Sequence, residues 1–249
     1  MLKKILCSVS LAAWGLAVLW PCQAAAPAKI ATVAPAADLV AEAEAKIKAL
    51  EEALATDQSY LGAKNTTIPT EAGVLAVLAQ ALAESEEASP LKGAAADLRE
   101  GAIAVAGSKS YDEAKKGLAA IKEAQGGKSA GAKAEAEWNK LCKLGALMKE
   151  VNKRNGKLRR ETRNLTNAEQ AARDASVLAV LALAAHDDTH EVKKPEQVAE
   201  WQKFAKEYQV QMTAAAAAFK KNDKAAAADA FKKGNTACND CHAKFRENE

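Results

Sequence analysis

The sequence is poor in glycine, proline and aromatic residues, and its charge is nearly balanced. Its 249 residues include only 13 glycines and 6 prolines, and 4% are aromatic. That scarcity argues against a strand-rich sandwich, and the five cysteines do not suggest a disulfide scaffold. The formal net charge of +3 gives no electrostatic reason to expect a nucleic-acid partner. Alanine is abundant within a hydrophobic fraction of 49%, and this composition predicts a helical protein.

The first 24 residues have the pattern of a secretory signal. Lys3 and Lys4 precede an apolar run over residues 5–20, and a small-residue stretch through Ala24 follows it. The run is shorter than the roughly 20 residues that cross a bilayer as a helix. We therefore expect a cleaved signal peptide over residues 1–24 and an exported, periplasmic protein with no integral membrane segment in its mature chain.

An internal repeat divides the rest of the chain. Residues 74–79 and residues 177–182 both read VLAVLA, and a proline opens the next segment in each copy, at Pro90 and at Pro195. A period of about 105 residues is too long for a solenoid unit, so it indicates a duplicated domain. A stretch rich in Gly, Ser and Ala joins the copies. The predicted boundaries are a first domain over residues 36–125, a linker over 126–134 and a second domain over 135–249.

Each copy has apolar positions spaced three and four residues apart, as in amphipathic helices. Thr166 and Glu169 have the spacing of a capping box, which predicts that a helix begins there. Four helices per copy predict an all-α fold of two tandem up-and-down four-helix bundles. The stripes of the first helices are Leu39, Ala43, Ile47, Leu50 and Leu54 in one copy, and Leu141, Leu144, Met148, Val151, Asn155 and Leu158 in the other.

The residues that carry chemistry lie near the C-terminus, in the segment Cys238-Asn239-Asp240-Cys241-His242. The pattern C-x-x-C-H is the attachment signature of c-type haem. Cysteines three residues apart share one face of a helix, so both can form thioethers with the haem vinyl groups while the adjacent histidine reaches the iron. We predict one covalent haem c in the second domain, with Cys238 and Cys241 as thioether sites and His242 as an axial ligand.

Three other interpretations of these cysteines are weaker. A thioredoxin-type redox pair requires a βαβ context that the sequence lacks. A zinc site requires four ligands, and the only further histidines are His186 and His190. A disulfide between Cys238 and Cys241 would be strained within a helix. In the first copy, residues 128–132 align with the motif and contain neither cysteine nor histidine, so that copy is predicted to be haemless.

The motif and its position on the last predicted helix make residues 136–249 resemble the class II cytochromes c, the cytochrome c-prime family. The resemblance implies a four-helix bundle with the two cysteines as thioether sites and the histidine as proximal ligand. Some members have an open distal face that small gases reach, and low-spin members have a methionine ligand in a segment similar to residues 147–150. Met148 is therefore the candidate distal ligand, with a core role for Met148, or ligation by Met212, as alternatives. The fused haemless copy departs from the family's single-bundle pattern.

These features predict a monohaem c-type cytochrome that transfers single electrons between Fe(II) and Fe(III) and is not an enzyme. The alternative is a five-coordinate haem protein that binds NO or CO. A third hypothesis is a scaffold whose first copy recruits a redox partner protein. The aromatic residues lie mostly after residue 131 and are expected to line the haem pocket.

Other polar and charged segments receive simpler interpretations. The loop from His186 to His190 is predicted to be acidic and solvated, and Cys142 to be buried. The basic run from Lys149 to Arg163 is predicted to be a solvated helix face, with partner docking as the alternative.

The two copies differ in the sign of their charge. Residues 26–130 contain 11 Lys and Arg against 15 Asp and Glu, whereas residues 131–249 contain 22 against 17. Opposite net charges favour intramolecular docking of the two bundles. Two independent bundles on a flexible linker are the alternative, because physiological salt screens charges of this size.

Overall fold

The computed structural model describes residues 29–246, and within that range all regular structure is helical. The predicted all-α class is confirmed, and the predicted signal segment, residues 1–24, lies outside the described residues. The helices are α1 (Ile30–Val33), α2 (Ala36–Ala53), α3 (Asp57–Ala63), α4 (Thr67–Glu84), α5 (Ala95–Ala106), α6 (Tyr111–Gln125), α7 (Leu144–Arg163), α8 (Ala168–Asp187), α9 (Val198–Lys220) and α10 (Lys224–Phe245). Short 3-10 turns, η1 (Lys92–Ala94), η2 (Trp138–Lys140) and η3 (Pro195–Gln197), precede α5, α7 and α9.

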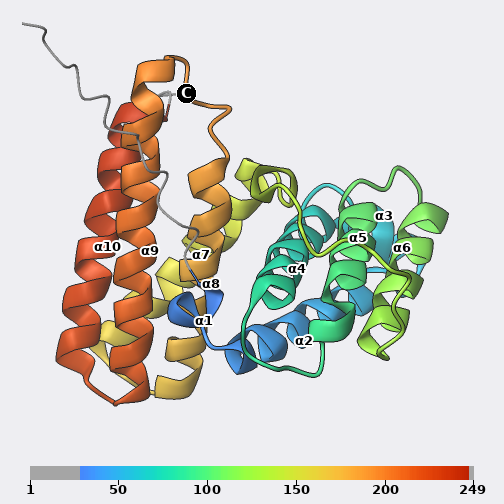
Figure 1. Ribbon diagram of the computed structural model, residues 1–249, viewed down its shortest axis with the longest axis horizontal. Coiled ribbons are helices and arrows are strands. Elements are labelled where there is room, and N and C mark those ends of the chain that lie inside the picture. Colours follow the sequence, from blue (N-terminus) through green and yellow to red (C-terminus); the bar gives the residue numbers. More distant parts are fainter. Residues whose placement is uncertain (1–28, 247–249) are drawn as a thin grey trace, which may run out of the picture.

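Helices α2–α6 and α7–α10 pack in two groups, and the short helix α1 contacts α4 of the first group and α8 and α9 of the second (Figure 1). In the first group, α4 packs between α2 and α5, and α5 packs against α6. In the second group, α8 packs between α7 and α9, and α10 packs against α9 and α7. The short helix α3 between α2 and α4 was not predicted, and it begins where the Thr56 side chain accepts a hydrogen bond from the backbone N–H of Ser59 at 3.1 Å. We call the two sets the N-terminal group (α2–α6) and the C-terminal group (α7–α10).

The VLAVLA repeat lies on α4 and α8, the two helices in which most residues are buried. All of residues 74–79 and 177–182 are buried. The reason is that both helices lie where the groups meet: α4 contacts α7 and α8, and α2 contacts α8 as well. A helix covered on all sides is apolar all round, so its sequence shows an unbroken apolar run instead of a stripe.

The N-terminus of α8 differs from the predicted capping box. Asn167 is the N-cap, and its side-chain oxygen accepts a hydrogen bond from the backbone N–H of Gln170 at 3.0 Å. Thr166 instead donates its hydroxyl and its backbone N–H to Glu161, both at 2.7 Å. The predicted N-cap residue was therefore wrong by one position. Thr166 does not cap α8 because its hydroxyl and its backbone N–H are bound to Glu161 of the preceding helix.

The segment predicted to be a linker lies along α5. Asp97 accepts hydrogen bonds from the Ser129 hydroxyl at 2.6 Å and from the backbone N–H of Ala132 at 3.1 Å. The buried guanidinium of Arg99 donates to the carbonyls of Lys133 at 2.7 Å and Ala134 at 2.9 Å. These four contacts hold the connection between the groups against the surface of the N-terminal group.

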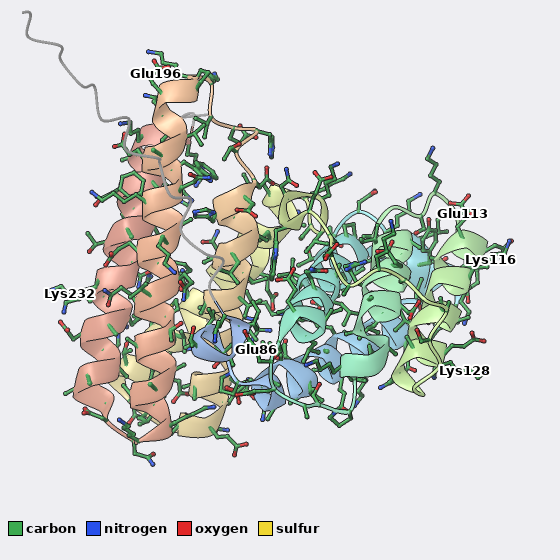
Figure 2. The ribbon with its side chains drawn as sticks, viewed as in Figure 1. Glu86, Glu113, Lys116, Lys128, Glu196 and Lys232 are labelled. Carbon is green, nitrogen blue, oxygen red and sulfur yellow. The ribbon has the colours of Figure 1, made fainter. Side chains whose placement is uncertain are left out.

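No single helix within residues 29–246 has both the length and the apolar composition to cross a membrane. Helices α3 and α4 meet those criteria only as a pair, which is bent by 80°. Most charged side chains point outward from the helices, such as Glu113, Lys116 and Lys232 (Figure 2). Buried charges are concentrated where the two groups meet, around Glu150.

The buried Glu150 carboxylate makes folding stability depend on pH. Burial by itself raises its pKa, but Arg154 and then Lys46 outweigh burial and lower the pKa from 4.5 to about 2. A depressed pKa adds stability that is fully present above about pH 4.5 and is lost as the pH falls toward 2. Linkage sets the size of this contribution at about 3 kcal/mol. Asp174 acts in the opposite direction, because burial raises its pKa.

We therefore expect Glu150→Gln to flatten the acid limb of the stability curve. Urea unfolding between pH 5 and pH 2 measures the free energy of unfolding of both proteins, and the comparison isolates Glu150 from Asp174. The parent protein should lose more stability over this interval than the variant. Equal slopes for the two proteins would show that Glu150 is not held ionised by its neighbours.

Candidate functional site

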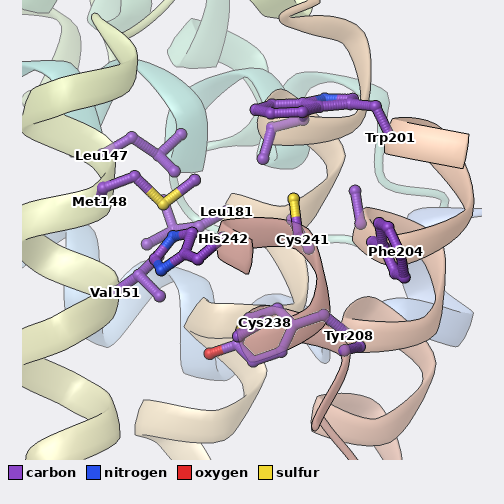
Figure 3. Close-up of a pocket in the computed structure, with 14 residues that line it drawn as sticks. Leu147, Met148, Val151, Leu181, Trp201, Phe204, Tyr208, Cys238, Cys241 and His242 are labelled. Atoms are coloured by element: carbon purple, nitrogen blue, oxygen red, sulfur yellow. The ribbon is translucent and has the colours of Figure 1, made fainter. Parts of the chain in front are cut away.

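An apolar pocket lies among the four helices of the C-terminal group (Figure 3). Its empty volume is about 480 Å³, including the part open to solvent. The lining residues are Leu147, Met148 and Val151 from α7, Leu181, Ala182 and Ala185 from α8, Trp201, Phe204, Ala205 and Tyr208 from α9, and Ala237, Cys238, Cys241 and His242 from α10. The structure thus brings together the four residues that the sequence predicts for the haem site, which are Met148, Cys238, Cys241 and His242.

Cys238, Cys241 and His242 enter the pocket from the last turns of α10. At the other end of α10, Asp223 is the N-cap, and its side chain accepts a hydrogen bond from the backbone N–H of Ala226 at 3.0 Å. The two cysteines are free and, like the histidine, half-buried. Their i, i+3 spacing on a continuous helix presents both sulfur atoms to one cavity.

Burial keeps all three of these groups neutral. It raises the pKa of the Cys238 thiol to about 12, with Cys241 adding to the effect, and that of the Cys241 thiol to about 11. Burial and then the nearby Arg246 charge lower the pKa of His242, which favours its neutral form. A neutral imidazole has a free nitrogen lone pair, so His242 is in the form that ligates a metal.

Met148 reaches the pocket from α7, on the side facing α10. Its side chain is half-buried, and Figure 3 shows the Met148 and His242 side chains pointing toward the same space. A second, wider hollow shares Met148 and His242 with the first and is lined also by Lys149, Glu191 and Arg246. The apolar pocket therefore adjoins a mouth with charged residues. Met212, the other candidate, is fully buried and does not line the pocket.

Aromatic rings form the α9 wall, and each is fixed by a specific contact. The Trp201 indole N–H donates to the Ala185 carbonyl at 2.7 Å. The Phe245 ring lies edge-on to Trp201, with 5.3 Å between centroids. The buried Tyr208 hydroxyl donates to Asn155 Oδ1 at 2.8 Å, which ties α9 to α7. These contacts fix the orientation of rings on this side of the pocket.

The expectation that the aromatics line the pocket holds for only some of them. Trp201, Phe204 and Tyr208 line it, whereas Phe219 and Phe231 are buried outside it. Sequence reasoning missed the small residues that leave room for a ligand: Ala182, Ala185, Ala205 and Ala237. One signal was available, because the VLAVLA register aligns Ala185 with Leu82, which fills the core of the N-terminal group.

The other residues noted in the sequence lie outside the pocket. Cys142 is buried as predicted, and its sulfur lies so close to Gly73 of α4 that a Cβ there would be 2.5 Å away. His186 is paired with Asp187 at 2.7 Å, and His190 contacts Glu191 at 3.1 Å.

Two further observations concern the zinc interpretation and the predicted absence of haem from the first copy. Within residues 29–246 no group of three or more His, Cys, Asp or Glu side chains is arranged to hold a metal ion. The described part of the N-terminal group contains neither cysteine nor histidine.

The prediction of a wholly solvated basic face on α7 was wrong at one position. Arg154 is 2% exposed and pairs with Glu42, Glu150 and Asp174. The remaining basic residues of the run lie outside the buried core: Lys149, Lys153, Lys157, Arg159, Arg160 and Arg163.

No protein-family model, no curated protein and no solved structure matches this chain.

Proposed function

We propose that the chain is an exported, periplasmic c-type cytochrome that transfers single electrons through one covalent haem c. The observation that carries this proposal is the pocket itself, in which two thiols and an imidazole from one stretch of α10 face an otherwise apolar cavity. Thioether attachment needs two thiols on one face, axial ligation needs a neutral imidazole, and a porphyrin needs apolar walls. The donor set and the lining therefore fit haem c.

The residues have distinct roles in this proposal. Cys238 and Cys241 would hold the haem covalently, each through a thioether. His242 is the proximal ligand, and Met148 on α7 is the candidate distal ligand. When bound, the haem supplies one-electron Fe(II)/Fe(III) exchange. The apolar side chains of the pocket would exclude water from the site, and Arg246, which lines the adjoining hollow, would add a positive charge near it.

The proposal includes the architecture and the family resemblance. We infer that the two groups are tandem four-helix bundles and that the second resembles the cytochrome c-prime family. The order of four long helices in each group, and the matching places of α4 and α8, support a duplication. Leu82 at the place of Ala185 supports a first bundle in which core side chains have replaced the ligand.

Gas binding is the second candidate function. Apart from Met148, the α7 and α8 residues that line the pocket offer only carbon atoms from their side chains: Leu147, Val151, Leu181, Ala182 and Ala185. If Met148 does not ligate the iron, these residues leave an open, apolar distal face. A small neutral gas is the ligand that such a face admits.

The test is the optical spectrum of the full chain purified from a periplasmic extract. We expect haem that stays on the polypeptide after denaturation, at one per chain, and a spectrum that changes reversibly with one electron. A low-spin reduced spectrum supports electron transfer, and a five-coordinate spectrum supports gas binding. A chain without covalent haem would reject both functions.

A further inference from the structure

A buried ion-pair network joins the N-terminal group to the helix that carries Met148. Two cations lie at its centre. Lys46 of α2 contacts Glu71 of α4 at 2.7 Å and Glu150 of α7 at 2.8 Å. Arg154 of α7 binds carboxylates from three helices, which are Glu42 of α2, Glu150 of α7 and Asp174 of α8. The network therefore connects α2, α4, α7 and α8.

The six central side chains of this network are almost entirely buried, and they comprise two cations and four carboxylates. Each of the six residues is less than 9% exposed: Glu42, Lys46, Glu71, Glu150, Arg154 and Asp174. At the rim, Lys153 lies 3.6 Å from Glu71 and 3.5 Å from Glu150. Breaking a buried pair leaves an uncompensated charge and costs about 3–5 kcal/mol, so this arrangement strongly opposes movement of α7 away from α2 and α4.

The network and the pocket occupy adjoining faces of α7. At 3.6 residues per turn, Glu150 and Arg154 lie within about 40° of each other around the helix axis, whereas Met148 lies about 160° from Glu150. Val151 and Asn155 lie between these directions, one lining the pocket and the other accepting the Tyr208 hydrogen bond. The network can therefore be altered without changing any atom of the pocket wall.

Inside the C-terminal group, α9 packs closely on both α8 and α10, whereas α7 packs less extensively on the same two helices. The position of α7 thus depends on the N-terminal group more than that of α9 or α10 does. Its neighbour Cys142 also packs against Gly73 of α4.

We propose that the N-terminal group is a positioning element for the distal side of the pocket, and that it acts through the contacts of Lys46 and Glu71 with α7. Glu150 and Arg154 are the positioning residues on α7 that receive this restraint. Where it concerns the distal ligand, the inference rests on the proposed function. In place of a haem of its own, the N-terminal group supplies the lateral support that sets how closely Met148 approaches the site.

The test is the double substitution Lys46→Gln/Glu71→Gln, which removes one charge of each sign from α2 and α4 and leaves every C-terminal residue unchanged. The matched control is Lys122→Gln/Glu51→Gln, which removes an exposed ion pair of 2.5 Å within the same group. Hydrogen exchange of the full chain, measured by mass spectrometry, reports the opening of α7 and needs no haem. We expect amides of residues 144–152 to exchange about tenfold faster in the network variant, which corresponds to about 1.4 kcal/mol, and amides of α10 to be unchanged.

A second readout follows the distal side directly. In haem-loaded protein reduced to the ferrous state, we expect carbon monoxide to bind several-fold faster to the network variant than to the control. Equal exchange of residues 144–152 in the two variants would overturn the proposal. Faster exchange with an unchanged rate of carbon monoxide binding would overturn it as well, because α7 would then move without consequence for the site.

If the double variant does not fold, Glu71→Gln alone is used. It keeps Lys46 in contact with Glu42 and Glu150, and a smaller increase in exchange over the same residues is expected, with the same two contrary outcomes. Failure of the proposed function is distinguishable from failure of this inference. A parent protein without haem rejects the function, while the exchange of α7 still reports whether the N-terminal group restrains that helix.

Discussion

The double variant Cys238→Ala/Cys241→Ala is expected to carry no covalently attached haem. Both candidate thioether sulfurs come from the same face of α10, and within the pocket lining they are the only thiols. Any haem that still ligates to His242 should then be removed by acidic acetone, whereas the parent protein should keep its haem. The melting temperature should also fall by roughly 5 °C or more, because a ligand that binds only the folded state stabilises it and an empty apolar pocket does not.

The control for this prediction is Cys142→Ala. Cys142 is buried against Gly73, outside the pocket, so this variant should retain a full complement of covalent haem. Haem staining of the denatured chain and mass spectrometry of its C-terminal peptide measure attachment. Haem that remains on the Cys238→Ala/Cys241→Ala chain after extraction would contradict the assignment of these two sulfurs.

The helices could be predicted from the sequence because their signals are local. The three-and-four spacing of the first-helix stripes and the VLAVLA repeat each depend on residues within a few turns of one another. The cap of α8 could not be predicted as easily, since Thr166 and Asn167 are both good capping residues. The choice between them depends on Glu161, which reaches back from α7 to bind Thr166.

The candidate site was predictable in its reactive residues and not in its walls. The spacing of Cys238, Cys241 and His242 identifies them in the sequence, because residues within one turn of a helix can reach the same ligand. The wall depends on which helices meet, and small residues such as Ala185 have no signal of their own. The buried network shows the same limit, because Arg154 lies in a basic run and one of its carboxylate partners, Glu42, is 112 residues away.

The variant Met148→Ala is expected to convert a low-spin haem spectrum into a high-spin one. Met148 is the only pocket-lining residue of α7 or α8 with a donor atom in its side chain, so no other lining residue of these two helices can replace its sulfur as the distal ligand. Loss of a thioether ligand should lower the reduction potential and open the ferrous iron to carbon monoxide. Optical spectra of both oxidation states, a redox titration and the rate of carbon monoxide binding measure these three effects.

Met212→Leu is the matched control for Met148→Ala, because it removes the other methionine sulfur of the C-terminal group. Met212 is fully buried and packs near Gly234, outside the pocket, so its replacement should leave spectrum and potential unchanged. An unchanged spectrum in Met148→Ala would assign Met148 to the pocket wall alone. The parent iron would then be five-coordinate or bound by another ligand, and carbon monoxide binding distinguishes the two, because an open distal face takes up the gas rapidly. If carbon monoxide binds rapidly, the apolar distal face, which the N-terminal group holds in place through α7, would be a gas site. Electron transfer would then lose its structural support.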